Sequence, residues 1–595
     1  MFFGIPLKKF QLFSISSQIG SGRIPLLYDF IEKEGAPLVF WLVFYFKKVL
    51  TGDYNIITLF LSITLFLLSI LALFTLSFMF IQIFNKLSYS RIILFQKIDS
   101  FFETMINIKT IYILIFLFLI SFILRLNYLD PGLLHHDSVQ YAIATEKTLE
   151  NGKLEPVVGE RYGLVIINVV GYFIPYFIFG IKSSEFVINI ITVLFASFSV
   201  VVLYLFTQEF LNNRHISISA ALLFSLNPIF LSVTTYTKDH SHSIFFIILA
   251  AYSLLKLIKT NSSLFKILFG LSMGILLFVR PSDIIVIIPL FGVYLLPNKF
   301  IEEDNSIKLN KRFGVRNLLL VLIPFLIFLS VYLSLYINNF FELGHSNRFL
   351  NPFPDLFDIF LITAIASTSL GSFLMVYGLF YILNRKKYSA ILFLIWFLSI
   401  LIFYSSFYST KLRFLVTLVI PSSILMAYGL NVIKQKFRLL SPLFLILVLV
   451  IMFIFVKPAL AFRHNYSSGK EVVKYVENLT ENNSLVFDWG DDVIFYDYYV
   501  KRNVNSCPYI SKEEEFKAKI ELINEALESN KSVYISDKCF LYGKKEELEK
   551  TVRALNENYD FKLVGKVYSE NYEDIIVLRG QEFGIYQLRK KLNKN

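Results

Sequence analysis

Long apolar runs without a charged side chain recur along most of this sequence, and the longer runs can each form a helix that crosses a lipid bilayer. Hydrophobic residues make up 55% of the chain and charged residues 17%, whereas about 25% charged residues is usual for a soluble globular protein. We therefore expect an all-α polytopic membrane domain with about 12 spans. The expected spans are residues 55–84, 110–126, 185–207, 216–234, 242–258, 265–279, 284–297, 317–337, 358–382, 389–408, 414–432 and 439–458.

Residues 163–181 decide on which side of the membrane the later loops lie. The segment is apolar but contains Pro175 and three glycines. If it does not cross, five groups of basic residues share one side, which the positive-inside rule makes cytoplasmic. These groups contain Arg214, Lys259, Arg312, Lys386 and Lys436. We therefore expect 163–181 to lie in the membrane interface or to re-enter, which makes the loop 127–162 and the chain after 458 extracytoplasmic.

The net charge of +12 belongs to the membrane part of the chain. Residues 461–595 carry 21 Lys and Arg against 23 Asp and Glu, so the whole excess of positive charge precedes them. Basic cytoplasmic loops account for such an excess, and nucleic acid is not an expected partner. We expect an N-terminal extension with one extra span (1–109), a membrane domain (110–458) and an extracytoplasmic domain (459–595).

The last region has the pattern of a small α/β domain. Helical stretches at 470–480, 513–529 and 544–557 alternate with β-branched runs. The runs cover 484–487, 532–536, 561–568 and 574–579. Both cysteines of the chain, Cys507 and Cys539, fall here; outside the cell they would form a disulfide, and two buried thiols are the equal alternative.

Residues suited to chemistry gather on the expected external face. Ionisable groups near lipid are costly unless they have a partner or a function, so their clustering on one side favours a functional site over a set of solvated helix ends. Five of the seven histidines lie on or beside this face: His135, His136, His240, His242 and His345. The acidic and basic members are Asp137, Glu160, Arg161, Lys238, Asp239, Arg280, Asp283, Lys411 and Arg413.

The order of several short motifs resembles that of the GT-C membrane glycosyltransferases, in particular glycosyltransferase family 39, which includes protein O-mannosyltransferases and aminoarabinose transferases. The matching residues are His136-Asp137 with Tyr141, Gly180, Asn213-Arg214, Thr237-Lys238-Asp239, and Arg413-Phe414 with Pro421. They cover roughly residues 110–458. The family usually has a second acid beside the first loop aspartate, and Ser138 stands in that place here.

This resemblance implies a transferase that takes a sugar from a polyprenyl-phosphate carrier and passes it, outside the cytoplasm, to a protein, lipid or glycan. We expect an inverting displacement with Asp137 as general base and Asp239 as the second catalytic acid. The expected donor phosphate ligands are Arg161, Arg280, Lys411 and Arg413, because guanidinium groups match phosphate oxygens. The expected substrate-binding residues are His136, Tyr141, Glu160, Lys238, His240 and His345.

A divalent metal is an open alternative for the same site. Asp137, Asp239 and His240 offer oxygen and nitrogen ligands suited to Mg²⁺ or Mn²⁺, as in the related oligosaccharyltransferases. The external string from Asp488 to Asp492, which is typical of a strand end that leads into a helix, is a poor match to the Trp-Trp-Asp-Tyr-Gly motif of those enzymes. Its acids and neighbouring tyrosines would suit sugar binding, but a soluble α/β domain contains such residues by chance.

Two functions of other classes remain as alternatives. A secondary transporter would place its charges near the middle of the bilayer and show an internal repeat, and neither feature is found in the sequence. A noncatalytic scaffold would use the tail to bind a partner. Loss of a cell-surface glycan on deletion, with rescue only by a copy that retains Asp137, would separate the enzyme from both.

Overall fold

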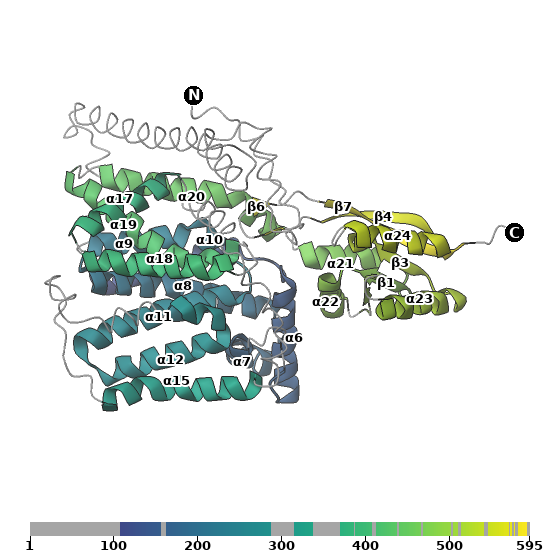
Figure 1. Ribbon diagram of the computed structural model, residues 1–595, viewed down its shortest axis with the longest axis horizontal. Helices are drawn as coiled ribbons and strands as arrows, with labels where there is room; N and C mark the ends of the chain where they lie inside the picture. Colours follow the sequence, from purple (N-terminus) through teal and green to yellow (C-terminus); the bar gives the residue numbers. More distant parts are fainter. Residues whose placement is uncertain are drawn as a thin grey trace, which may run out of the picture.

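The computed structural model describes most of residues 108–591. The gaps are at 156, 158–161, 182, 287–314, 337–368, 386, 407–411, 437–439, 466–467, 501, 503, 510–512, 541–544, 570–571, 574–575 and 578–580. The span expected at 55–84 therefore lies outside the described residues. Two parts are visible in Figure 1, a bundle of long helices and a smaller domain built around a sheet.

The helical bundle confirms the expected membrane fold class. Of the described helices, four are long and apolar enough to cross a membrane, and six shorter apolar helices accompany them. In chain order the bundle contains α5 (Thr110–Leu126), α6 (His136–Asn151), α7 (Tyr162–Phe177), α8 (Glu185–Leu211), α9 (Arg214–Leu226), α10 (Pro228–Val233), α11 (Asp239–Thr260), α12 (Ser263–Val279), the 3-10 helix η3 (Pro281–Val286), α15 (Val315–Tyr336), α17 (Ser369–Arg385), α18 (Lys387–Ser406), the 3-10 helix η5 (Leu412–Leu418), α19 (Val419–Lys436) and α20 (Leu440–Asn465).

The expected single span at 216–234 is wrong, because the chain breaks between α9 and α10. Pro228 has no backbone N–H and cannot continue a helix from the preceding turn. The side-chain oxygen of Asn227 accepts hydrogen bonds from the N–H groups of Ile229 and Phe230, which caps α10 as a new helix. The break turns the chain toward the residues that lead into α11.

Small residues allow helices of the bundle to approach closely. A Cβ atom at Gly378 of α17 would collide with the Leu425 carbonyl oxygen of α19, and one at Gly270 of α12 would collide with the Val321 carbonyl oxygen of α15. In lipid such close backbone packing takes the place of the hydrophobic driving force between helices.

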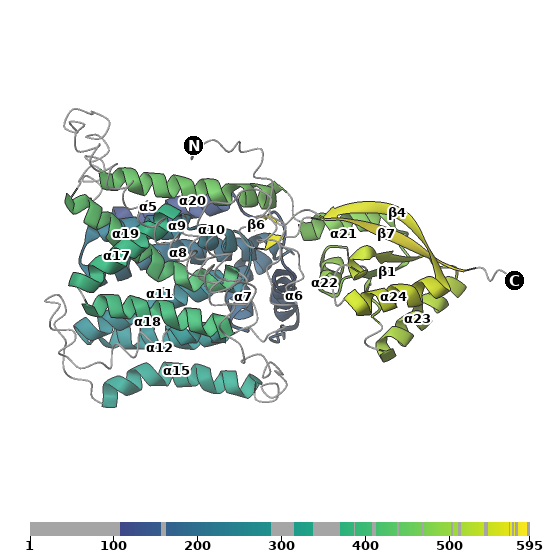
Figure 2. The ribbon, with the colours of Figure 1, turned by 45° about the horizontal axis from the view of Figure 1, so that its top comes forward.

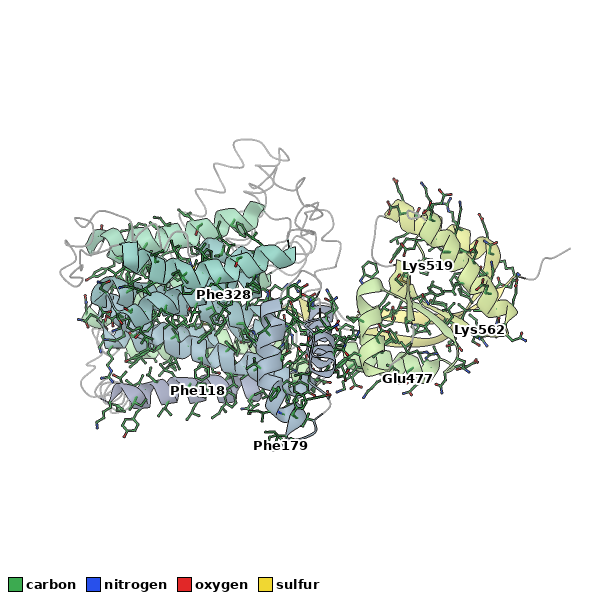
Figure 3. The ribbon with its side chains drawn as sticks, turned by 90° about the horizontal axis from the view of Figure 1, so that it is seen from below. Phe118, Phe179, Phe328, Glu477, Lys519 and Lys562 are labelled. Atoms are coloured by element: carbon green, nitrogen blue, oxygen red, sulfur yellow. A yellow bond between two sulfur atoms is a disulfide. The ribbon has the colours of Figure 1, made fainter. Side chains whose placement is uncertain are left out.

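Helices α6 and α7 run across the ends of the long helices instead of along them. In Figure 1, α6 stands upright while α8, α11, α12 and α15 lie horizontally. Gly163, near the start of α7, packs on Phe278 at the end of α12, and Gly171 packs on Ile191 near the start of α8. Phe179, just beyond α7, is 70% exposed and lies at the outer edge of the bundle in Figure 3.

The smaller domain has three layers, with helices on both faces of a five-stranded sheet. The strand order is β2-β1-β3-β7-β4, with β1 parallel to β2 and β3, and β7 antiparallel to β3 and β4. Successive strand residues face opposite layers: Val486 packs with α21 and α22, whereas Phe487 packs with α23 and α24. Figure 2 shows β4 and β7 running above α23 and α24.

Most elements of this domain agree with the expected alternation. The elements are α21 (Ser468–Leu479), β1 (Leu485–Asp488), α22 (Gly490–Tyr499), β2 (Val504–Ser506), α23 (Glu513–Glu528), β3 (Val533–Ser536), η6 (Asp537–Phe540), α24 (Lys545–Asn558), β4 (Tyr559–Ser569), β5 (Tyr572–Glu573), β6 (Ile576–Val577) and β7 (Gln581–Lys590). Strands β2 and β7 were not expected. Cys507 and Cys539 form a disulfide, which resolves the alternative left open by the sequence.

One hydrophobic core joins the two parts of the molecule. It contains Leu133, Val139 and Ile188 from the bundle together with Val472 of α21 and Phe495 of α22. Polar contacts surround it: Lys470 lies 3.1 Å from Glu185, and the Tyr498 hydroxyl donates a hydrogen bond of 3.0 Å to Glu146. In Figure 3 the side chains of α6 occupy the space between the bundle and the sheet domain. The sheet domain is therefore packed directly on the loop that precedes α6.

Candidate active site

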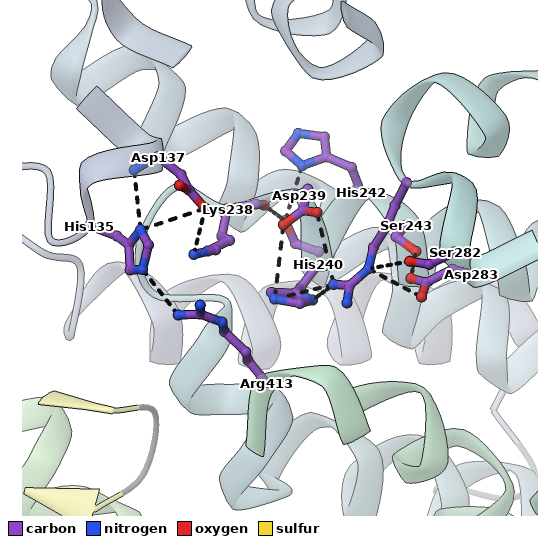
Figure 4. A network of polar contacts seen from close by, with 12 residues as sticks. His135, Asp137, Lys238, Asp239, His240, His242, Ser243, Ser282, Asp283 and Arg413 are labelled. Carbon is purple, nitrogen blue, oxygen red and sulfur yellow. Dashed lines mark hydrogen bonds and ion pairs between the residues drawn. The ribbon is translucent and has the colours of Figure 1, made fainter. Parts of the chain in front are cut away.

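Two segments that are far apart in the sequence meet at the candidate site. The first is the start of α6 with His135, His136 and Asp137, and the second is the start of α11 with Lys238 and Asp239. The Lys238 Nζ atom lies 3.0 Å from Asp137 Oδ2, as Figure 4 shows. Lys238 is 2% exposed, whereas the Asp137 side chain is 23% exposed. Asp137 is thus the member of the pair that solvent reaches.

Helix starts position both aspartates. Asp137 lies in the first turn of α6, and its N–H donates a hydrogen bond of 3.1 Å to His135 Nδ1 in the cap. Asp239 lies in the first turn of α11. A carboxylate is favoured at a helix N-terminus because the unpaired N–H groups there carry partial positive charge.

Neighbouring charges control the ionisation of the pair. Burial raises the pKa of Asp137, but Lys238 and the hydrogen bond from His136 outweigh burial and hold this pKa well below its usual range. Burial and the Arg413 guanidinium lower the pKa of Lys238 to about 7. Burial and Lys238 also hold the pKa of His135 well below its usual value, so the imidazole is neutral.

Arg413 completes this first cluster. It comes from η5, and its Nη1 atom lies 3.1 Å from His135 Nε2. His136 Nε2 lies 2.9 Å from Asp137 Oδ1. The expected site residues Asp137, His136, Lys238 and Arg413 are therefore brought together, and Lys238 and Arg413 supply its two cations.

A second, buried cluster lies beside the first and contains Arg280. The Arg280 Nε atom is 3.2 Å from Asp283 Oδ1, and its Nη1 atom is 3.9 Å from Asp239 Oδ2. Arg280 also contacts the His240 ring, and the Ser243 hydroxyl donates to Asp283. The side chain of Arg280 is 4% exposed. Two carboxylates thus face this guanidinium, and the expected role of Arg280 as a phosphate ligand stays a prediction.

Two other residues singled out by the sequence, Tyr141 and Asp488, are buried. Tyr141 is 1% exposed and packs with Leu164 and Val165 of α7, and its expected contact with substrate stays a prediction. Asp488 is fully buried and accepts hydrogen bonds from the Trp489 N–H and the Tyr496 hydroxyl, so this acid of the tail motif has a structural role. Four expected site residues lie outside the described part of the chain: Glu160, Arg161, His345 and Lys411.

The expected metal ligands do not form one group. Within the described residues, the group with metal-ligand spacing is His135, His136 and Asp137, whose ligand atoms lie within 4.8 Å of one another. Asp239 and His240 instead face Arg280. The His135 ring is engaged by the Asp137 N–H and Arg413, and Asp137 holds the Lys238 ammonium. A divalent cation here would stand next to two cationic side chains, so these residues do not fit one.

Asn189, which connects the two segments of the site, was not expected from the sequence. This residue of α8 is 1% exposed and forms hydrogen bonds with Gly132 on one side and Thr237 on the other. The only available signal was an amide in the first turns of an apolar helix. Asn, Ser and Thr are common in such helices, so that signal does not identify a residue of the site.

Comparison with known proteins agrees with the fold and the sequence motifs. Residues 169–331 match the model of a family described as dolichyl-phosphate-mannose-protein mannosyltransferase. No curated protein matches the sequence.

Solved structures with a similar fold include ArnT from Cupriavidus metallidurans. Bound to undecaprenyl phosphate, it is 12% identical with a TM-score of 0.53, covering 80% of this chain and 97% of its own. The apo state gives 10% identity, the same TM-score of 0.53 and the same coverage of 80% and 97%. The apo oligosaccharyltransferase of Archaeoglobus fulgidus is 12% identical with a TM-score of 0.46, covering 82% and 75%. This chain is therefore similar, over part of its bundle, to a mannosyltransferase family, and it shares the fold of ArnT.

Proposed function

We propose that the protein transfers a sugar from a polyprenyl-phosphate donor to a hydroxyl of a protein, lipid or glycan on the extracytoplasmic side of the membrane. The observation that carries this proposal is the Asp137–Lys238 pair at 3.0 Å, with Arg413 beside it. It places one carboxylate and two cations at the point where two expected external segments meet. The binding of undecaprenyl phosphate by ArnT, which has a similar fold, supports a lipid phosphate as part of the donor.

The proposed reaction is a single displacement at the anomeric carbon. The acceptor oxygen forms a bond to that carbon as the bond from the carbon to the phosphate oxygen breaks, and the electron pair leaves with the polyprenyl phosphate. The acceptor proton passes to Asp137. Attack from the face opposite the leaving group inverts the configuration of the sugar. Lys238 and Arg413 bind the phosphate and stabilise the charge that it gains.

Binding of the donor would also make Asp137 a better base. In the free protein Lys238 lowers the pKa of Asp137, which leaves the carboxylate ionised but weakly basic. A phosphate that shares the Lys238 ammonium weakens this effect, so the pKa of Asp137 rises when the donor is in place. Burial lowers the pKa of Lys238 to about 7 in the free protein. A bound phosphate raises this pKa, because an anion beside a buried ammonium stabilises its charged form.

The disulfide supports the extracytoplasmic assignment of the sheet domain. Cys507 and Cys539 are bonded, and disulfides persist mainly in oxidising compartments. The sheet domain packs on the loop before Asp137, so both belong to the same side of the membrane.

The test is transfer of radiolabelled sugar from a polyprenyl-phosphate donor by the purified protein in lipid nanodiscs. Asp137→Asn should lower the transfer rate by about 10²- to 10⁴-fold, because it removes the general base. Lys238→Gln should mainly raise the KM for the donor. The matched control is Lys256→Gln, because Lys256 lies near the other end of α11 and forms an ion pair of 2.6 Å with Glu209 of α8, away from the site. Full transfer by folded Asp137→Asn protein would refute the assignment of the base.

A further inference from the structure

One buried amide holds together the two segments of the candidate site. Asn189 projects from α8 and is 1% exposed. Its Nδ2 atom donates hydrogen bonds to the carbonyl oxygens of Gly132, at 2.9 Å, and Asp130, at 3.3 Å. Its Oδ1 atom accepts hydrogen bonds from the N–H of Thr237, at 3.0 Å, and from the Thr237 hydroxyl. The amide therefore uses both its donors and both its acceptor positions.

The backbone partners determine the orientation of this amide. Thr237 presents an N–H, which can only donate, whereas Gly132 and Asp130 present carbonyl oxygens, which can only accept. A flipped amide would place like groups against each other on both sides, so the assignment of Nδ2 and Oδ1 follows from the network. For the same reason an aspartate at position 189 would not replace the asparagine fully, because its second carboxylate oxygen would lie against the carbonyl oxygens of Gly132 and Asp130 and could not donate to them.

Each partner of Asn189 lies next to a residue of the Asp137–Lys238 pair. Thr237 directly precedes Lys238, and Gly132 lies in the short loop that leads to Asp137. Two further contacts connect the same segments: the Ser138 hydroxyl donates to the Thr237 carbonyl oxygen, and the Asp130 N–H donates to the Thr235 carbonyl oxygen at 3.1 Å. The start of α6 and the start of α11 are thus connected through hydrogen bonds, with Asn189 between them.

We propose that Asn189 is a positioning residue for the transfer reaction, which sets the distance between Asp137 and Lys238 by holding Gly132 and Thr237 from a rigid helix. The proposal rests on the proposed function for its effect on transfer, but its structural part does not. α8 is packed against α5, α9 and α11, so it provides a fixed support for both loops. Neither loop has regular structure at these residues, so a loss of the amide weakens the support of both.

The main experiment compares Asn189→Leu with Thr192→Val. Thr192 lies one turn further along α8, is fully buried, and its hydroxyl bonds only to Ile188 of the same helix among the described contacts. Asn189→Leu should reduce transfer by about 10²-fold, the effect of about 1 Å of misplacement. It should also accelerate backbone hydrogen exchange in residues 128–138 and 234–239. Thr192→Val should change neither measurement.

Asn189→Asp provides a second test of the proposal if Asn189→Leu does not fold. The carboxylate keeps the two hydrogen bonds from Thr237 and loses those to Gly132 and Asp130, so exchange should increase in residues 128–134 while the Thr237 amide stays protected. Equal exchange and transfer in wild type and Asn189 variants would overturn the proposal. A wild-type protein that transfers no sugar would refute the proposed function instead, and the exchange comparison would still decide the role of Asn189.

Discussion

Asp137 and Lys238 depend on each other in the free protein. A lysine that is 2% exposed would lose its charge unless an anion lay nearby, and Asp137 provides that anion. The carboxylate in turn stays ionised because Lys238, with His136, outweighs the effect of burial on its pKa. In the proposed reaction, the phosphate of the donor disturbs this pair and thereby raises the basicity of Asp137.

Metal removal tests the chemistry of these side chains. Because Lys238 and Arg413 flank Asp137 and His135, cationic side chains already supply the positive charge that a metal ion would bring. Protein treated with EDTA and then freed of it should keep its transfer rate, measured with the same donor and acceptor. Loss of transfer that Mg²⁺ or Mn²⁺ restores would contradict this prediction and would favour the metal-dependent, oligosaccharyltransferase-like alternative.

The apolar runs of the sequence predicted the positions of the helices well, but they did not predict a break within a run. The expected span at 110–126 coincides with α5 (Thr110–Leu126), because Lys109 precedes the apolar run and Arg125 lies in its last turn. The run 216–234 has no charged residue, so hydropathy alone does not reveal its break. The break is a local effect of Asn227 and Pro228, and it shows that turn chemistry has to be considered even inside an apolar run.

The contact between α17 and α19 gives a prediction about stability in the membrane domain. Gly378→Ala should destabilise the protein by about 1–3 kcal/mol, because the added Cβ would collide with the Leu425 carbonyl oxygen and force the helices apart. The measurement is thermal unfolding in detergent. Gly490→Ala is the control, since a Cβ there would meet nothing closer than Ser506 Cβ at 3.9 Å. Equal unfolding temperatures for the two variants would disprove close packing of α17 on α19.

At the scale of the whole molecule, the sheet domain helps to hold the loop before the candidate site in place. The Leu133 N–H, in the loop that leads to Asp137, donates a hydrogen bond of 2.8 Å to the Tyr499 hydroxyl of α22. Lys470 lies above the Tyr499 ring, 5.4 Å from its centroid, and also binds Glu185 of α8. The domain thus holds the loop from the side opposite the bundle.

Removal of one hydroxyl tests this support. Tyr499→Phe should lower the transfer rate by about tenfold, because the Leu133 N–H loses its acceptor and the loop before Asp137 shifts. Tyr498→Phe is a matched control, because it removes a hydroxyl of the same interface that binds Glu146, farther along α6. The measurement is kcat with saturating donor. If both variants lose the same activity, the interface serves stability alone and Tyr499 has no positioning role.

The sequence alone determined the membrane class, from the length of the apolar runs, and the α/β character of the tail, from its strand and helix periodicity. The order of the residues along the chain also assigned Asp137, Lys238 and Arg413 to one group. All three are local properties of the chain. It did not determine which charges face one another. Only the tertiary structure assigned Lys238 to Asp137 and Arg280 to Asp283, joined the two cysteines and revealed Asn189. These pairings depend on how helices distant in the sequence pack together. A shift of a few ångströms makes or breaks a hydrogen bond or an ion pair, and a local sequence pattern does not contain distances of this kind.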